Sequence, residues 1–380
     1  MIDWLRQLVK PEYEPLNQVE IIKQNILDNF CYLQSLAPQQ KIWPVLKANA
    51  YGHGLKEMCQ ILNQSPAEMV VVDSFPEAQI AYRYFRKRIL ILSELPVAAY
   101  RYTKFSRTEF CVYNVDTFKY LARYHQQARV HLFLNTGMNR EGIDDLNSFL
   151  AAVKTDLPKL KIVGLASHLA SADEDKIENI KQQEKFWAAV ELLKAQRIDN
   201  LVLHLGNSAA IFSTPDKRFS AFRAGLALYG YNPFVQSSQH YLVAQKLKPA
   251  LRITSKITAV RKIAAGEHVS YNQSYEASQA TNIGVIPFGY FEGLDRRFSN
   301  QAELRCLASH PFYAKIAGRV CMNITALELG ANPVKLGDGV EVISPDNLAP
   351  NSINNLASLI NTIPYEILVR IQSNIHREIV

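Results

Sequence analysis

The sequence is poor in cysteine and has no long uninterrupted apolar run. Its 380 residues include five cysteines, which lie far apart and form no C-x-x-C pair. This usage excludes a disulfide framework and argues against structural zinc, so we expect reduced thiols and no metal site. No stretch approaches the roughly 18 apolar residues that a membrane-spanning helix requires, so we expect no membrane association.

Charge of one sign is not concentrated anywhere in the chain. Lys and Arg number 42 against 35 Asp and Glu, a formal net charge of +7, and only residues 86–88 and 296–297 form short basic clusters. This spread argues against nucleic-acid binding and favours a mildly basic enzyme with an anionic ligand. The first ten residues lack the apolar segment and small cleavage-site residues of a signal peptide, so we expect a cytoplasmic protein.

The sequence does contain a regular alternation of short apolar runs and helical patterns. Residues 19–35 carry Ile22, Ile26, Phe30 and Leu33 on one helical stripe, and further helices are expected at 115–126, 144–154 and 176–197. The strand-like runs are 41–47, 69–73, 89–92, 110–113, 129–134, 160–165, 200–205 and 224–229. Apolar strands separated by helices indicate a parallel sheet, and eight units predict an α/β fold with a TIM-like (β/α)8 barrel over residues 1–245.

The pattern changes after about residue 245. Alternating β-branched residues occur at 252–260, 282–287 and 323–329, and a glycine-rich turn lies at 336–340. Only 353–361 looks helical in this part of the chain. The sequence therefore predicts a second, mostly β C-terminal domain over residues 246–380.

Polar residues follow several of the strand-like runs, where a barrel places its functional groups. Lys47 ends the first run, and a desolvated lysine suits Schiff-base chemistry, although a lysine that reaches past the barrel rim would leave the same pattern. Asn207 and Ser208 follow the run at 200–205 and Gly225 lies in the run at 224–229, where such barrels commonly bind phosphate. Turn chemistry is the alternative for those residues taken alone.

The resemblance to a known family lies in these same segments. The string VLKANAYGHG at 45–54 is similar to the pyridoxal-phosphate attachment motif of alanine racemases. Further matches in the family's order are TGMNR at 136–140, HLASADE at 168–174, His204 with NSAA at 207–210, RAGLALYG at 223–230, SYNQSY at 270–275, IPFGY at 286–290, GRVCM at 318–322 and IPYE at 363–366. The resemblance covers almost the whole chain.

The resemblance implies a binding site for pyridoxal 5'-phosphate. Lys47 would attach the cofactor covalently, and Arg223 would face its pyridine nitrogen. The other cofactor-binding residues implied are Tyr51, His168, Asn207, Ser208, Gly225, Leu226 and Tyr365, most of them around the phosphate. Because arginine stays protonated, it hydrogen-bonds an unprotonated ring nitrogen, which makes the ring a weaker electron sink and leaves more of the catalysis to acids and bases.

Racemisation needs a base on each face of the α-carbon. By the resemblance these are Lys47 and Tyr275, the tyrosine coming from the other subunit of a homodimer. Because a tyrosine with a pKa of about 10 is a poor base at neutral pH, we expect His168 and Arg223 to act as cations that lower it. Taken alone, Tyr275 would be an aromatic residue filling the β domain, and His168 and His204 would be buried core histidines. A metal site at His168, Asp173 and Glu174 is disfavoured.

The residues implied for substrate binding are Arg140, the Met322 backbone amide and Tyr290 near the entrance. Here the chain departs from the family pattern. Phe133 and Asn135 stand where a lysine, often carbamylated, and an aspartate are usual, so that Asn135, Glu141 or a bound anion must orient Arg140. In addition, Asn323 replaces an aspartate and Asn272 replaces a glycine.

The function implied is the interconversion of L-alanine and D-alanine, which would supply D-alanine for peptidoglycan. The departures around Arg140 keep a serine or broad-specificity amino-acid racemase as an alternative. A decarboxylase of the same architecture is disfavoured because the motif around Lys47 is of the racemase type. A non-catalytic pyridoxal-phosphate-binding protein is a further alternative, against which the β domain and Tyr275 argue.

Overall fold

The computed structural model describes residues 14–174, 176–213 and 216–380. These form two compact units, one of residues 21–250 and one of residues 14–20 with 251–378. The division at 245/246 drawn from the sequence placed residues 14–20 with the barrel, whereas the structure groups them with the C-terminal unit. The ten N-terminal residues used to judge the absence of a signal peptide lie outside the described residues.

The first unit is a closed parallel barrel. Its strands are β2 (Lys41–Pro44), β3 (Met69–Val72), β4 (Arg88–Ile91), β5 (Thr108–Val112), β6 (Arg129–Phe133), β7 (Lys161–Ala166), β8 (Val202–His204) and β9 (Ala221–Ala224). Strands β3 to β8 pair in sequence order, and β9 pairs with β2. The two remaining gaps are bridged where Leu46 N donates to Val71 O at 2.7 Å and Ser220 N donates to Leu203 O at 2.8 Å. The predicted barrel is confirmed.

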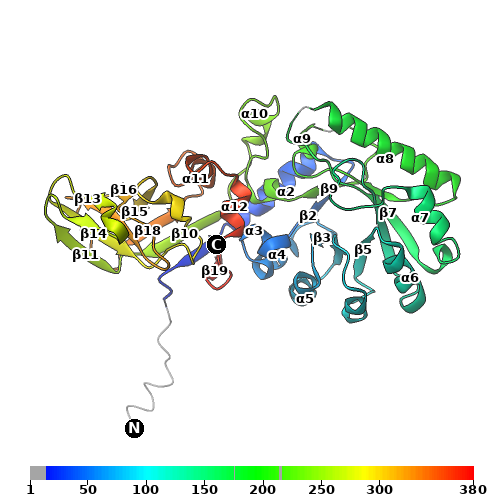
Figure 1. The fold of residues 1–380 in the computed structure, drawn as a ribbon, viewed down its shortest axis with the longest axis horizontal. Coiled ribbons are helices and arrows are strands. Elements are labelled where there is room, and N and C mark those ends of the chain that lie inside the picture. Colours follow the sequence, from blue (N-terminus) through cyan, green and yellow to red (C-terminus); the bar gives the residue numbers. More distant parts are fainter. Residues whose placement is uncertain (1–13, 175, 214–215) are drawn as a thin grey trace, which may run out of the picture. The chain divides into compact units, whose positions relative to one another are not determined.

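Helices cover the outside of these strands, as Figure 1 shows for α4 to α8. Those of the barrel unit are α2 (Lys23–Leu36), α3 (Lys47–Tyr51), α4 (Leu55–Leu62), α5 (Phe75–Tyr84), α6 (Val115–Tyr124), α7 (Leu146–Ala152), α8 (Ile177–Ala195), α9 (Ala210–Ser213) and α10 (Tyr241–Ala244), with 3-10 turns at Val97–Tyr102, Leu157–Lys159 and Leu226–Tyr229. Helix α2 buries Ile26, Phe30 and Leu33, as the stripe predicts. The strands are buried on both faces, which explains their continuous apolar runs.

Two sequence predictions for this unit are wrong in detail. The last strand was expected at 224–229, but it is Ala221–Ala224, and Leu226–Tyr229 forms a 3-10 turn whose residues are all buried. A short, fully buried apolar run has no periodicity that separates strand from helix. The helix expected from residue 19 begins at Lys23, because Val19 and Ile21 are buried alternately with Gln18 and Glu20 in a strand.

The second unit is built on a nine-stranded sheet in the order β11-β14-β17-β16-β15-β18-β10-β1-β19. Its strands are β1 (Gln18–Ile21), β10 (Leu251–Lys256), β11 (Ala259–Ile263), β14 (Thr281–Ile286), β15 (Glu303–Cys306), β16 (Phe312–Ile316), β17 (Thr325–Gly330), β18 (Gly339–Ile343) and β19 (His376–Ile379), and a separate ribbon joins β12 (His268–Val269) to β13 (Tyr275–Glu276). The mostly β domain is confirmed. The run at 252–260 is two strands, not one.

Helices are few in this unit. They are α11 (Ile353–Leu359) and α12 (Pro364–Val369), with 3-10 turns at Tyr271–Gln273 and Arg296–Phe298. Helix α11 confirms the prediction at 353–361, whereas α12 was not predicted. Its six residues are too few to show a helical period, and its one sequence signal is the proline at its first position.

The five cysteines are all unpaired. Burial raises the pKa of the Cys59, Cys111 and Cys306 thiols to about 12, so these thiols stay protonated at neutral pH. No described helix is long and apolar enough to cross a membrane. Within residues 14–174, 176–213 and 216–380, no group of three His, Cys, Asp or Glu side chains is arranged to hold a metal ion.

Candidate active site

Lys47 begins a left-handed turn at the end of the first barrel strand. The φ angles of Ala48, Asn49, Ala50 and Tyr51 are 53°, 53°, 53° and 52°. A left-handed helical residue other than glycine costs about 1–2 kcal/mol, so a run of four stores strain that the surrounding structure must hold. Such concentrated strain is typical of functional sites, and the sequence shows no sign of it.

Side chains from the next helices hold this turn. Glu77 on α5 accepts a hydrogen bond from Ala48 N at 2.7 Å through Oε1 and one from Asp73 N at 2.8 Å through Oε2. Asn49 Oδ1 accepts from Leu55 N at 2.9 Å, where α4 begins. Glu77 was not among the residues predicted for the site, although Ser74 and Glu77 form a capping box whose spacing is visible in the sequence.

The Lys47 side chain is 40% exposed, and its Nζ lies 4.0 Å from Asp73 Oδ1. In a single copy of the chain Lys47 is therefore partly exposed to solvent, whereas the sequence predicted a desolvated lysine. It lies at the carboxyl end of the barrel strands, where barrel enzymes place reactive groups.

Ser208, Gly225 and Tyr51 form a polar cradle beside the ends of β8 and β9. Ser208 Oγ accepts hydrogen bonds from Gly225 N at 2.9 Å and Ala227 N at 3.2 Å. A Cβ on Gly225 would lie 2.5 Å from the Tyr51 hydroxyl, so only glycine fits here. The Tyr51 ring lies 5.0 Å from that of Tyr229, centroid to centroid, which limits how far it can move.

The neighbouring residues implied for the cofactor have different surroundings. Leu226 is buried at the start of its 3-10 turn. Asn207 Oδ1 accepts from Ala209 N at 3.1 Å and Ala210 N at 3.3 Å, at the start of α9. Asn207 thus performs the turn chemistry that the sequence left open. Tyr365 lies on α12 of the C-terminal unit.

Arg223 is buried in the barrel, with 3% of its surface exposed. Its Nη1 donates to His204 Nδ1 and to His204 O, both at 2.8 Å. Its Nη2 donates to Ser167 O at 2.6 Å and to His168 Nδ1 at 3.2 Å. Nε has no hydrogen-bond partner among the residues described. Burial lowers the pKa of Arg223 to about 10, so the guanidinium remains charged at neutral pH.

His168 is neutral, which corrects one part of the sequence analysis. Burial and the nearby charges of Arg223, Arg140 and Lys47 lower the pKa of His168 to about 3. Because its Nδ1 accepts a hydrogen bond from Arg223, its proton is on Nε2. The expected cationic role of His168 is therefore wrong for this chain, and Arg223 is the charged member of the pair.

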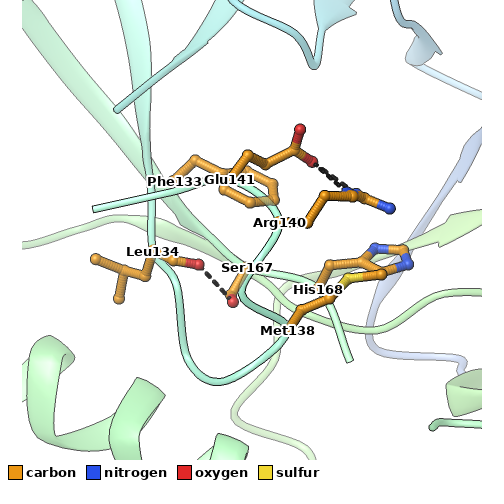
Figure 2. A pocket seen from close by; sticks show the side chains of 7 residues that line it. All are labelled: Phe133, Leu134, Met138, Arg140, Glu141, Ser167 and His168. Atoms are coloured by element: carbon orange, nitrogen blue, oxygen red, sulfur yellow. Dashed lines mark hydrogen bonds and ion pairs between the residues drawn. The ribbon is translucent and has the colours of Figure 1, made fainter. Parts of the chain in front are cut away.

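Arg140 lines a pocket of the barrel unit together with Phe133, Leu134, Met138, Glu141, Ser167 and His168. Figure 2 shows Arg140 bonded to Glu141 and lying on the same side of the pocket as His168. The distances to Glu141 Oε1 are 2.6 Å from Nη2 and 3.2 Å from Nε. Asn135 instead bonds the loop, with its Nδ2 2.7 Å from Asp144 Oδ1. Of the two side chains considered as partners of Arg140, Glu141 makes the contact.

Tyr275 lies in the second unit, on β13. It packs against a small core of Ile263, Ala277, Ile283 and Ala317. Burial and the neighbouring Glu328 carboxylate raise the pKa of Tyr275 to about 12. Within the described part of its own chain Tyr275 is therefore a protonated phenol, and no cation there lowers its pKa.

Met322 and Tyr290 are also in this unit, and both side chains are exposed. Tyr290 N donates to Cys321 O at 3.0 Å, which ties the two segments together. Met322 lines a hollow with Ser270, Tyr271, Cys321, Asn323 and Ile324. The family residues implied for the site thus fall into two groups, one in the barrel and one in the C-terminal unit.

Two departures from the family pattern have a local explanation. Asn272 has a φ of 57°, a left-handed conformation that glycine adopts freely and asparagine tolerates. Asn323 Nδ2 donates to Glu292 Oε1 at 2.8 Å, a bond that an aspartate could not donate. Both asparagines therefore suit the backbone and charges around them.

The buried histidines make the barrel sensitive to acid. Burial lowers the pKa of His168 and His204, while in the unfolded chain both return to about 6.5. Below pH 6.5 the unfolded chain binds more protons, so stability falls as the pH falls. Each histidine contributes about 1.4 kcal/mol per pH unit, so lowering the pH from 7 to 5 should remove about 4 kcal/mol in total. Urea unfolding followed by circular dichroism at both pH values measures this, and an unchanged free energy of unfolding would contradict it.

Known proteins resemble the chain along almost its whole length. Residues 21–233 match the alanine racemase N-terminal domain, and residues 250–379 match the alanine racemase C-terminal domain. An alanine racemase of Leptospira interrogans is 30% identical over 95% of each chain, and one of Clostridium perfringens is 30% identical over 94% of each. The solved alanine racemase of Acinetobacter baumannii, 29% identical, superposes with a TM-score of 0.82 over 97% of this chain and 100% of that one. The chain belongs to the alanine racemase family.

Proposed function

We propose that the protein is a pyridoxal-phosphate-dependent racemase that interconverts L-alanine and D-alanine. The observation that carries the proposal is the grouping, at one end of the barrel strands, of the strained Lys47 turn, the Ser208–Gly225 cradle and the buried Arg223. Relatives that share both domains are named alanine racemases. The product D-alanine would serve peptidoglycan synthesis, and the cysteine usage favours the cytoplasm as the compartment.

The residues present fit the cofactor. Arg223 Nη1 and Nη2 have acceptors, but Nε has none in the described structure. Nε is therefore available to donate a hydrogen bond to the pyridine nitrogen of the cofactor. The Ser208 hydroxyl, the Tyr51 hydroxyl and the backbone at Gly225 and Leu226 supply groups for a phosphate. Asn207 shapes the turn beside them. Bound at Lys47, the cofactor supplies an electron sink that acidifies the α-proton of the amino acid.

Lys47 and Tyr275 would move the protons. Lys47 Nζ serves one face of the α-carbon, and Tyr275 of a second copy serves the other, which requires a homodimer. Tyr275 has a pKa of about 12 beside Glu328 in its own chain. In the dimer, the charge of Arg223 at the site of the second copy, acting through the neutral His168, would lower it. Sedimentation of the protein with and without cofactor tests the dimer.

Arg140 would bind the substrate carboxylate, and the Met322 amide and Tyr290 would come to that site from the C-terminal unit of the second copy, as Tyr275 does. Glu141 holds the guanidinium by two nitrogens and leaves Nη1 for the substrate. Glu141 would therefore orient Arg140, as the carbamylated lysine does in relatives where this chain has Phe133. Because Glu141 also carries a negative charge, it weakens carboxylate binding, and Phe133 gives this side of the pocket an apolar wall suited to a small side chain.

Chiral chromatography tests the reaction. The purified protein, loaded with pyridoxal phosphate, is incubated separately with L-alanine, L-serine and L-lysine. We expect rapid formation of D-alanine and slower or no product from the other two. D-serine or D-lysine formed as fast as D-alanine would instead show a broad-specificity racemase. No D-product from any substrate, with the cofactor bound, would overturn the proposal and favour a binding protein or a decarboxylase.

Gly225→Ala should weaken cofactor binding by about tenfold, or 1.4 kcal/mol, because the new Cβ would displace the Tyr51 hydroxyl. Titration of the apoprotein with pyridoxal phosphate, followed by visible absorbance, measures the affinity. Tyr51→Phe removes the atom that clashes, so Gly225→Ala should cost less affinity in that background. If Gly225→Ala lowered the affinity for pyridoxal phosphate equally in the parent protein and in Tyr51→Phe, Gly225 and Tyr51 would not act on the same phosphate site.

A further inference from the structure

A line of buried polar side chains crosses the barrel beneath Arg223. Below the Arg223–His204 bond, His204 Nε2 lies 2.9 Å from His131 Nδ1, and His131 Nε2 lies 2.8 Å from Glu109 Oε2. His204 and His131 are fully buried and Glu109 is 2% exposed. His204 ends β8, His131 is in the middle of β6, and Glu109 lies near the start of β5. The chain therefore runs from the carboxyl end of the strands toward their amino end.

Arg223 and Glu109, at the two ends of this hydrogen-bonded chain of side chains, determine which nitrogen of each histidine carries the proton. Arg223 can only donate, so His204 Nδ1 accepts and carries no proton. The His204 proton is then on Nε2 and is donated to His131 Nδ1. The His131 proton is in turn on Nε2 and is donated to the Glu109 carboxylate. If either imidazole were charged, both of its nitrogens would carry protons, and one of them would face another N–H donor. A protonated Glu109 that donated to His131 Nε2 would likewise place the His131 proton on Nδ1, opposite the His204 Nε2–H.

Glu109 is held as an anion at the lower end. Arg129 Nε donates to its Oε1 at 2.6 Å, and Arg88 Nη1 does so at 3.2 Å. Burial by itself raises the pKa of Glu109, but the hydrogen bonds from His131 and Arg129 and the charge of Arg129 outweigh burial and lower it to about 2. Arg223 bonds neutral imidazoles and carbonyl oxygens, so Glu109 is the anion joined to it through hydrogen bonds.

The packing leaves the two imidazoles little freedom to turn over. A Cβ on Gly164 would lie 2.0 Å from His131 Nδ1, so the glycine makes room for that ring. The Trp43 ring meets the His204 ring edge-on, with the centroids 5.0 Å apart. The donor–acceptor direction of these hydrogen bonds could therefore be reversed only by proton transfer between the side chains, because the rings cannot rotate.

We propose that Glu109 and His131 are positioning residues that fix the His204 tautomer and, through it, the Arg223 guanidinium. With Nη1 and Nη2 both held by acceptors, Nε is the donor left to face a ligand. The part of this inference that concerns the ring nitrogen of pyridoxal phosphate rests on the proposed function. The tautomers of His131 and His204 do not depend on it.

Glu109→Gln is the informative variant because an amide cannot serve both neighbours. If its oxygen faces Arg129 and Arg88, its NH2 group faces His131 Nε2 and reverses the chain, which brings His204 Nδ1–H against Arg223. If its oxygen faced His131, its NH2 group would oppose two charged guanidinium donors, so we expect the first arrangement, which reverses the chain. Glu341→Gln is the matched control, since Glu341 is 3% exposed and bonded to Arg252 at 2.7 Å in the C-terminal unit.

The first measurement is the 15N chemical shift of the histidine side chains in the full chain without cofactor, assigned with variants that each lack one histidine. We expect His204 and His131 to be Nε2–H tautomers in the parent protein and in Glu341→Gln, and His204 to change in Glu109→Gln. A parent His204 protonated on Nδ1 overturns the proposal without any variant, as does an unchanged His204 in Glu109→Gln.

The second measurement uses the holoenzyme loaded with 15N-labelled pyridoxal phosphate. The ring-nitrogen shift should move in Glu109→Gln but not in Glu341→Gln, and kcat should fall about tenfold while KM for alanine, which depends on Arg140, changes little. An unmoved ring nitrogen contradicts the link to Arg223. Failure of the parent protein to bind the cofactor would instead count against the proposed function, and the histidine tautomers would still test the positioning role.

Discussion

Lys47→Arg is expected to abolish racemisation, reducing kcat by at least about 10³-fold. A guanidinium stays protonated, so it can neither attach the cofactor covalently nor remove a proton. Pyridoxal phosphate should still enter the site through the Ser208–Gly225 cradle and Arg223, but it should be removed by dialysis. Visible absorbance before and after dialysis, together with chiral chromatography, measures both effects.

Lys41→Arg is the matched control, because Lys41 is an exposed lysine at the start of β2, the strand that precedes the Lys47 turn, and is paired with Glu68 at 2.7 Å. It should keep the activity and the bound cofactor. Lys47→Ala should behave as Lys47→Arg does, which separates the loss of the amine from the introduction of a larger side chain. Retention of turnover in either Lys47 variant would remove this residue from the mechanism.

Tyr275→Phe is expected to abolish formation of D-alanine from L-alanine, again by about 10³-fold, while the absorbance of the bound cofactor is unchanged. One base remains, so Lys47 should still exchange the α-proton of one of the two enantiomers, tested separately, with deuterium from D2O. Mass spectrometry of the recovered alanine detects the exchange. Tyr313→Phe, at a tyrosine exposed on β16 of the same unit, should leave turnover as it is.

Mixing the two inactive variants tests whether each site is shared between chains. A dimer of one Lys47→Ala chain and one Tyr275→Phe chain has one complete site, with the lysine of one chain and the tyrosine of the other. Random exchange of subunits should therefore restore about one quarter of the parent activity. No recovery after exchange, or full activity of Tyr275→Phe alone, would show that Tyr275 does not act across a dimer.

Much of the site is predictable from the order of residues along the chain. A barrel places polar residues at the carboxyl ends of its strands, so Lys47 and Ser208 stand out where apolar runs end, while Arg223 directly precedes the last run at 224–229. Their grouping in the barrel unit follows from the closure of the parallel sheet. The motif around Lys47 also points to the family, and both of its domains match this chain.

The conformation of the Lys47 turn is not predictable in the same way. Four residues other than glycine adopt left-handed angles there, against their local preference. They do so because Glu77, from a helix about 30 residues further along the chain, accepts the Ala48 N–H. Local propensity has no information about such a contact. For the same reason the buried turn at Leu226–Tyr229 looks like a strand in the sequence.

By itself, the amino-acid sequence determined the eight strand–helix units, the β-rich unit after them, and which side chains are candidates for the site, since periodicity and motif spacing are properties of the chain. Only the tertiary structure decided the state of those side chains. His168 is neutral because burial and three neighbouring cations disfavour its charge, and Glu109 is linked to Arg223 because four strands bring the side chains of Glu109, His131, His204 and Arg223 together in the core. Protonation and hydrogen bonding depend on the groups within a few ångströms of a side chain, and these come from residues far apart in the sequence.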